Sequence, residues 1–110
     1  MQISSETVED TLVVRLEGNL DTNSSPEAQD YLNKAIDEGA DSVIVSFDQV
    51  EFVSSAGLRV LLATAKRLTG TGGSLRVCGL NETVSEVFEI SGFSTILNVF
   101  ASESEALSGS

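Results

Sequence analysis

The sequence predicts a single α/β domain built on a mixed, mostly parallel sheet. At 110 residues the chain is long enough for one hydrophobic core but not for two. Segments with strand periodicity alternate with segments of helical periodicity, in the order β-β-α-β-α-β-α-β. The nearly continuous apolar run Val43–Val45 is typical of a strand buried on both faces, as parallel strands between helices are. Such alternation implies right-handed crossovers between parallel strands.

The first third of the chain predicts a hairpin followed by a helix. Gln2–Thr7 and Thr11–Leu16 have strand character, and the short polar connection Glu9-Asp10 joins them as an antiparallel pair. A capping sequence then leads to Pro26, at a position typical of the first turn of a helix. Apolar residues recur on one helical face until Gly39, where we expect the helix to end.

The rest of the chain predicts further strands and helices in alternation. One helix begins at a pair of serines and ends near Thr69, and another follows Asn81 as its N-cap and closes at Gly92. The strands are expected over Ser42–Phe47, Ser74–Cys78 and Ile96–Phe100. We assign the domain to residues 1–101 and interpret residues 102–110 as a polar tail that can hold a short helix over Glu103–Leu107.

The amino-acid composition limits which kinds of partner the chain can bind. Seventeen acidic and six basic residues give a net charge of −11. Nucleic acid and anionic membrane surfaces are therefore disfavoured as partners, because both bind through clustered Lys and Arg side chains. The charge fits either solubility alone or attraction of a basic protein partner. No apolar run approaches the roughly 20 residues of a membrane helix, and the N-terminus lacks a secretory signal, so we expect a cytoplasmic location.

The residue types present also exclude several kinds of catalytic site. There is no histidine, which removes His-based triads, the zinc helix motif and the usual proton shuttle. The one cysteine, Cys78, falls in a predicted strand, where a buried thiol is expected. Gly70–Gly73 lacks the lysine of a phosphate-binding P-loop and leads into a strand, so we interpret it as a turn.

Three acidic residues are the remaining candidates for metal or acid–base chemistry. Asp21, Asp48 and Glu51 lie near the serine loop in the predicted topology, and Asp21 and Asp48 each follow a predicted strand, so we expect these two at the same end of the sheet. A magnesium or general-base site, as in a nucleotide-hydrolysing enzyme, is one interpretation. The other is that these are solvated acids at loop ends, which form turns.

The most informative stretch is the one that joins the third strand to the second helix. Ser54 and Ser55 stand where a helix N-cap belongs, before apolar residues at helical spacing. Neither serine has a histidine to activate it or lies in a Gly-x-Ser-x-Gly elbow, so a nucleophilic hydrolase is disfavoured. A serine here can cap the helix, or it can receive a phosphate at the positive end of the helix dipole.

Element order and two motifs together resemble the STAS-domain family, specifically the bacterial anti-sigma factor antagonists. The family's Gly-x-Leu/Ile-Asp turn is matched by Gly18–Asp21. Its apolar pair followed by Asp-Ser-Ser/Thr/Ala-Gly-Leu/Met is matched by Phe52–Leu58, which reads Phe-Val-Ser-Ser-Ala-Gly-Leu. The resemblance covers the chain from the first hairpin to the last strand and implies a STAS-type domain.

The resemblance also implies a function and a set of site residues. The family's phosphorylated serine falls on Ser55, with Ser54 as the second choice. The unphosphorylated protein would bind an anti-sigma factor, often a serine kinase, and phosphorylation would release it. ATP and magnesium would belong to that partner, so the chain itself is expected to be no enzyme and to need no cofactor or metal. The implied partner-binding residues are Asp21, Ser54, Ser55, Gly57, Leu58 and Arg59.

One position departs from the family pattern. The residue that is usually aspartate before the phosphoserine is Ser54 here. This change is compatible with altered kinase recognition, with a phosphate on either serine, or with a STAS module that is never phosphorylated. The alternative function is therefore a non-phosphorylated scaffold or an accessory subunit of a stress-signalling or transporter complex.

Overall fold

The computed structural model describes residues 1–93 and 97–109, and it confirms the predicted α/β order with a short C-terminal helix. Most predicted boundaries agree with it to within two residues. In the last predicted strand, Leu97 lies in a bend and Ile96 lies outside the described residues. The elements are β1 (Gln2–Val8), β2 (Thr11–Glu17), α1 (Ser25–Asp37), β3 (Ser42–Gln49), α2 (Ser55–Gly70), β4 (Ser74–Cys78), α3 (Glu82–Ile90), β5 (Asn98–Phe100) and α5 (Glu103–Ser108).

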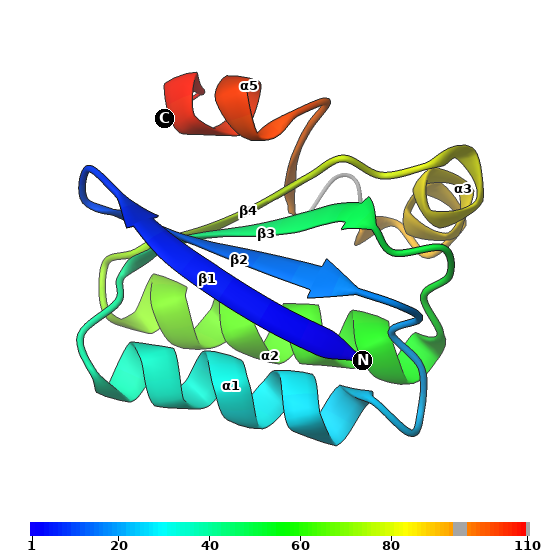
Figure 1. Cartoon of the computed structure of the whole chain (residues 1–110), viewed down its shortest axis with the longest axis horizontal. Helices are drawn as coiled ribbons and strands as arrows, with labels where there is room; N and C mark the ends of the chain where they lie inside the picture. The colour runs from blue at the N-terminus through cyan, green and yellow to red at the C-terminus, as the bar shows by residue number, and fades with distance from the viewer. Residues whose placement is uncertain (94–96, 110) are drawn as a thin grey trace.

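The five strands form one sheet in the order β1-β2-β3-β4-β5 (Figure 1). β1 and β2 pair antiparallel, with Val8 opposite Thr11 across the turn Glu9–Asp10. The pairs β2–β3, β3–β4 and β4–β5 are parallel. Because parallel strands end at the same edge of a sheet, the loops that follow β2 and β3 come out next to each other.

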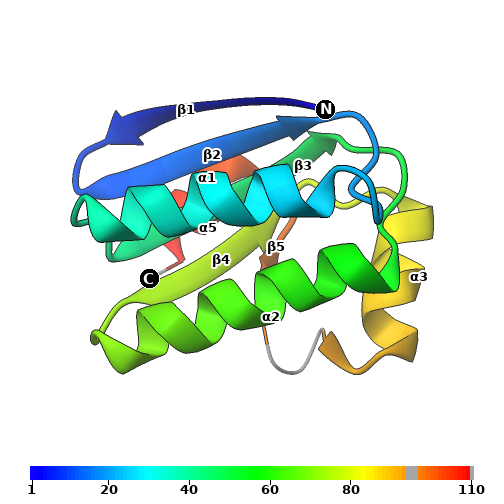
Figure 2. The same cartoon turned by 90° about the horizontal axis from the view of Figure 1, so that it is seen from below.

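The main core lies between the sheet and the helices α1 and α2, which lie side by side on one face (Figures 1 and 2). Val14, Val45 and Val77 are in register on three neighbouring strands, and all three are fully buried. Leu32 of α1 and Leu61 of α2 are buried in the same cluster. Burial of these side chains supplies the principal stabilisation of the fold.

The opposite face of the sheet is covered by α5 (Figure 1). Val13, Ile44 and Cys78 are fully buried there in a second, smaller cluster with Ala106 of α5. Burial raises the pKa of the Cys78 thiol to about 11. The centre of β3 is thus buried on both faces, which is the physical basis of its continuous apolar run.

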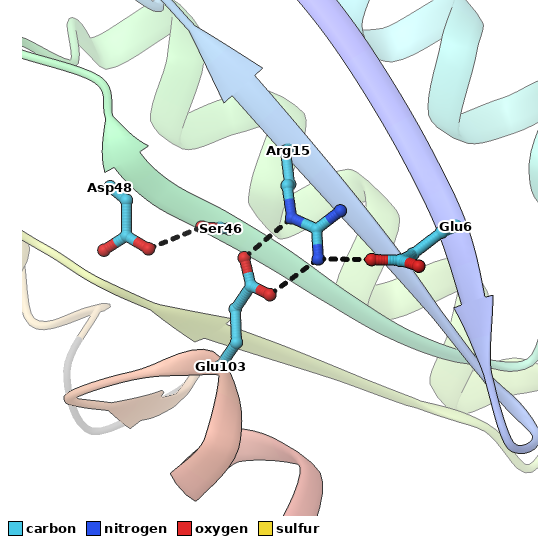
Figure 3. A network of polar contacts seen from close by, with 5 residues as sticks. All are labelled: Glu6, Arg15, Ser46, Asp48 and Glu103. Carbon is cyan, nitrogen blue, oxygen red and sulfur yellow. Dashed lines mark hydrogen bonds and ion pairs between the residues drawn. The ribbon is translucent and has the colours of Figure 1, made fainter.

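Polar contacts hold α5 on this second face (Figure 3). The Arg15 guanidinium donates to both carboxylate oxygens of Glu103, at 2.9 and 2.8 Å, and to Glu6 at 2.6 Å. Arg76 donates to the carbonyl oxygen of Ala106. A helix of six residues is too short to be stable by itself, so α5 depends on these contacts and on the burial of Ala106.

A charge placed in the main core tests the assignment of β3. Val45→Asp should lower the free energy of unfolding by several kcal/mol, because an unpaired carboxylate would enter the space between the sheet and the helices. Chemical denaturation followed by circular dichroism measures this. Thr69→Asp, an exposed change in α2, is the matched control and should cost little. An unchanged denaturation midpoint for Val45→Asp would contradict the placement of this strand.

The ion pair between Arg15 and Glu103 predicts that the stability of α5 depends on pH. Hydrogen bonds from Arg15 hold the pKa of Glu103 below its ordinary value. A carboxylate with a lowered folded-state pKa stabilises the fold above its unfolded pKa, and that contribution is lost as the pH falls through the folded-state pKa. We therefore expect hydrogen-exchange protection of the Ala106 amide, which donates to the Ser102 carbonyl, to fall below about pH 4.

The variant Glu103→Gln should show this weaker protection already at neutral pH, with little further change on acidification. Glu105→Gln, two residues further along α5, keeps the Arg15 pair and is the control. Exchange rates must be corrected for their intrinsic pH dependence. If Glu103→Gln kept the protection and the pH response of the parent, the Arg15–Glu103 pair would not be needed to hold α5 on the sheet.

Candidate partner-binding site at the serine loop

Two loops meet at the edge of the sheet where β2 and β3 end. The serine loop (residues 50–54) follows β3, and the β2–α1 loop (residues 18–24) follows β2. The Leu20 amide donates to the Phe52 carbonyl at 3.0 Å, and the Ser54 amide donates to the Leu20 carbonyl at 2.9 Å. Leu20 thereby forms an isolated parallel bridge with the serine loop. The structure brings the two predicted loops side by side.

The two serines have different places in α2. Ser54 is the N-cap: its backbone is extended (φ −92°, ψ 174°), and its Oγ accepts a hydrogen bond from the Gly57 amide at 3.4 Å. Ser55 is the first helical residue and is exposed. Of the two serines that could cap the helix, Ser54 does so and Ser55 does not. The Ser55 hydroxyl is left at the surface.

Gly57 and Leu58 lie beneath this surface rather than on it. Both are buried, and Leu58 is only 6 % exposed. A Cβ at position 57 would lie 2.8 Å from both Cγ and the carbonyl oxygen of Leu20. Glycine is needed here because the first turn of α2 packs directly on the β2–α1 loop. These two residues hold the serine loop in place and have almost no exposed surface to offer a partner.

Asp21 lies in the β2–α1 loop but uses its carboxylate locally. Its Oδ1 accepts hydrogen bonds from the backbone amides of Asn23 at 3.0 Å and Ser24 at 3.1 Å. These bonds, of which the one from Ser24 contributes most, lower the pKa of the Asp21 carboxyl. The side chain stabilises the turn that starts α1, and its negative charge stays at the rim of the serine loop.

Asp48 faces the other side of the sheet. It accepts a hydrogen bond from Ser46 Oγ at 3.4 Å, on the face that carries Arg15 and Glu103 (Figure 3). Asp21 and Asp48 therefore share an edge but not a face, which contradicts a joint magnesium or acid–base site. Within residues 1–93 and 97–109, no three acidic or thiol side chains form a group that could hold a metal ion.

The surface around Ser55 combines an aromatic ring with a cation. Phe52 is 44 % exposed, although large apolar side chains are usually covered. Arg59, one helical turn beyond Ser55, is also exposed. An exposed aromatic residue before a helix and an exposed arginine in its second turn are residue types that protein–protein contacts favour. The composition of this surface is therefore typical of a docking surface.

Comparison with known proteins identifies the family of this chain. The STAS-domain profile matches residues 2–106, almost the whole chain. The chain belongs to the STAS-domain family. Its match includes most of α5, so the C-terminal helix falls within the region that the profile covers.

Curated relatives of this STAS domain include anti-sigma factor antagonists. The chain is 34 % identical over 106 residues to BtrV of Bordetella bronchiseptica, which is named as a candidate anti-sigma factor antagonist, and the match covers 96 % of this chain and 91 % of BtrV. It is 31 % identical over 108 residues to the anti-sigma F factor antagonist of Paenibacillus polymyxa, covering 97 % and 92 % of the two chains. Such antagonists are non-enzymatic regulators.

Solved structures of the anti-sigma factor antagonist SpoIIAA are also similar. Its unphosphorylated form superposes with a TM-score of 0.82 at 29 % identity, covering 96 % of this chain and 93 % of SpoIIAA. The phosphorylated form from Bacillus superposes with a TM-score of 0.74 at 27 % identity, covering 97 % of each chain. SpoIIAA is thus a relative of this STAS domain that has been observed with and without a phosphate.

One residue that fixes the serine loop of the STAS domain was recognised from sequence only as a cap. Asn81 Oδ1 accepts from the Val84 amide at 2.8 Å and so caps α3. Its Nδ2 also donates to the carbonyl oxygens of Val50 and Glu51, each at 3.2 Å. A serine or aspartate could cap the helix but could not donate these two bonds. The choice of asparagine at this N-cap, with a side-chain amide that can donate, is the sequence signal that the residue also holds the serine loop.

The remaining features of the STAS domain lie away from the serine loop. A hollow of about 560 Å³ lies at the opposite end of the sheet, where the β1–β2 turn meets the end of α1 and the loop before β3. Among the residues that the structure describes, no helix is long and apolar enough to cross a membrane.

The close approach at Gly57 predicts opposite effects for two alanine substitutions in α2. Gly57→Ala should destabilise the fold by about 1–3 kcal/mol, because the added methyl group overlaps the backbone and side chain of Leu20. Gly70→Ala, in the same helix but with open space around it, should stabilise by up to about 1 kcal/mol. Thermal denaturation of both variants checks this. Equal gains in stability would show that α2 can move away from Leu20 at no cost.

Proposed function

We propose that this STAS domain is an anti-sigma factor antagonist that binds an anti-sigma factor and is released when Ser55 is phosphorylated. Family membership and 31 % identity to an anti-sigma F factor antagonist support the proposal. The observation that carries it is the position of Ser55, which is exposed as the first residue of α2, directly after a loop held by Leu20 and Asn81. A kinase can reach such a hydroxyl, and a partner can dock there without ordering the loop first.

The phosphorylation step needs a kinase, which we take to be the anti-sigma factor itself. The Oγ of Ser55 forms a bond to the γ-phosphorus of ATP, and the bond from that phosphorus to the β–γ bridging oxygen breaks. ADP leaves, and the hydroxyl proton passes to a base of the kinase. ATP and magnesium stay with the partner, so this chain contributes the accepting hydroxyl only. We place both proteins in the cytoplasm.

The partner surface consists of the exposed side chains of the serine loop and of α2. Ser54, Ser55 and Arg59 would contact the anti-sigma factor, with Asp21 at the rim. Gly57, together with Leu58, supports this surface from below. A phosphate on Ser55 would add a charge of about −1.5 to −2 in the middle of the contact. The N-terminal amides and dipole of α2 favour that charge, so the cost falls on binding rather than on folding.

A second candidate function is a STAS scaffold that is never phosphorylated, including an accessory subunit of a stress-signalling or transporter complex. One observation favours it: Ser54 stands where the family usually has aspartate, and its hydroxyl already caps α2. Under this alternative the serine loop still binds a partner, but it carries no switch. The two functions differ in whether Ser55 changes chemically.

Variants at the two serines separate these functions. Phosphorylation of Ser55 should weaken binding by about 2–3 kcal/mol, on the order of a hundredfold. Ser55→Asp should reproduce part of that loss, and Ser55→Ala should bind the anti-sigma factor but resist the kinase. Ser54→Ala is the control: it should lose about 1 kcal/mol of stability with the cap yet still accept a phosphate on Ser55. Calorimetry and phosphosite mapping by mass spectrometry make these measurements.

Incubation with the anti-sigma kinase and ATP decides the assignment. Modification confined to Ser54 would move the phosphosite by one residue. Modification of neither serine, with binding intact, would favour the scaffold.

A further inference from the structure

The exposed side of α2 carries a local charge opposite to that of the whole protein. The helix contains three of the chain's six basic residues and no acidic residue, although the net charge is −11. Spacing of three and four residues brings its exposed positions into one line along the helix. We call this line the α2 stripe; it consists of Ser55, Arg59, Ala63 and Lys66. The stripe begins at the candidate phosphosite.

Arg59 differs from the other three arginines, each of which has a partner for its side chain. Arg15 and Arg67 form ion pairs, and Arg76 donates to the carbonyl oxygen of Ala106. Among the residues that the structure describes, Arg59 makes no ion pair or side-chain hydrogen bond. Its guanidinium is therefore available both to a partner and to any anion that arrives nearby.

A phosphate on Ser55 would be such an anion. Residues four apart on a helix have Cβ atoms about 5–6 Å from each other, which places Ser55 and Arg59 within reach of one another. An anion placed four residues before a cation is the favourable order along a helix. The planar guanidinium matches two phosphate oxygens at once, which a lysine cannot do.

We propose that a phosphate on Ser55 draws Arg59 into a salt bridge within α2, which removes from the stripe the cation that meets an acidic patch of the anti-sigma factor. The phosphate thus acts twice, by adding negative charge to the contact and by withdrawing a positive one. The acidic patch follows from charge complementarity with a stripe that has no acidic residue. The effect on partner binding rests on the proposed function, whereas the formation of the salt bridge does not.

The first test examines the salt bridge without any partner. The full chain is made with phosphoserine encoded at position 55, and the phosphate is titrated by phosphorus NMR. Its second pKa is ordinarily about 6. With Arg59 bound, the pKa of the phosphate should be about half a unit lower than in Arg59→Gln. Asp21 and Glu51, the acids of the neighbouring loops, are present in both proteins and do not affect the difference.

Lys66→Gln is the matched control for this titration. It removes the same charge from the same exposed stripe, eleven residues beyond the phosphate. That distance is about 16 Å along a helix, roughly two Debye lengths at physiological salt, so the titration should match that of the parent. A phosphate pKa that is the same in the parent and in Arg59→Gln would overturn the salt bridge.

The second test measures binding to the anti-sigma factor in a double-mutant cycle. Arg59→Gln should weaken the unphosphorylated complex about fivefold, with a reduced dependence on salt. The loss caused by phosphorylation should shrink from about a hundredfold in the parent to about twentyfold in Arg59→Gln, because the withdrawn cation is already gone. An equal loss in both proteins would overturn the regulatory half of the inference.

The two tests distinguish a failure of the proposed function from a failure of this inference. If neither form of the parent bound an anti-sigma factor, the proposed function would be wrong, and the titration would still decide the salt bridge. The parent could instead bind the anti-sigma factor and be released by phosphorylation, with the same phosphate pKa in the parent and in Arg59→Gln. The proposed function would then stand, and this inference would be wrong.

Discussion

The candidate site depends on the contact between the first turn of α2 and the backbone of Leu20. Two hydrogen bonds join Leu20 to the serine loop, and the missing side chain of Gly57 lets the helix approach it. Asn81 holds the same loop from the other side. Because three elements fix one short loop, Ser55 is presented in a defined position at the edge of the sheet. A partner can therefore bind without an entropic cost for ordering this loop.

Sequence reasoning recovered the fold because the fold depends on burial, and burial leaves a periodic pattern. The run Val43–Val45 is continuous because β3 is covered by α1 and α2 on one face and by α5 on the other. The helix-start pattern at Ser54 and Ser55 located the serine loop, and the family motifs then implied its function. The geometry of single residues was harder to predict from the sequence. Whether Ser54 or Ser55 caps α2 depends on one residue of helix boundary, which propensity does not resolve.

The choice between the two interpretations of the acidic residues stayed open for a similar reason. Asp21 and Asp48 do follow neighbouring parallel strands, but the pleat of β3 turns Asp48 toward the opposite face of the sheet. An aspartate one position earlier or later on β3 would point to the other face. The ion pair of Arg15 and Glu103 joins positions 88 residues apart, and no local pattern reports such a pairing. What escaped prediction is therefore the direction of individual side chains.

Cys78 lies under α5, and this has a consequence for the chemistry of the protein in the cell. With its pKa raised to about 11, the thiol carries almost no thiolate at neutral pH, and thiolate is the form that oxidants and alkylating reagents attack. Burial beneath Ala106 also denies such reagents access while α5 is seated. The Cys78 thiol should therefore stay unreactive while α5 is packed on the sheet, and it would become reactive only in molecules from which α5 has detached.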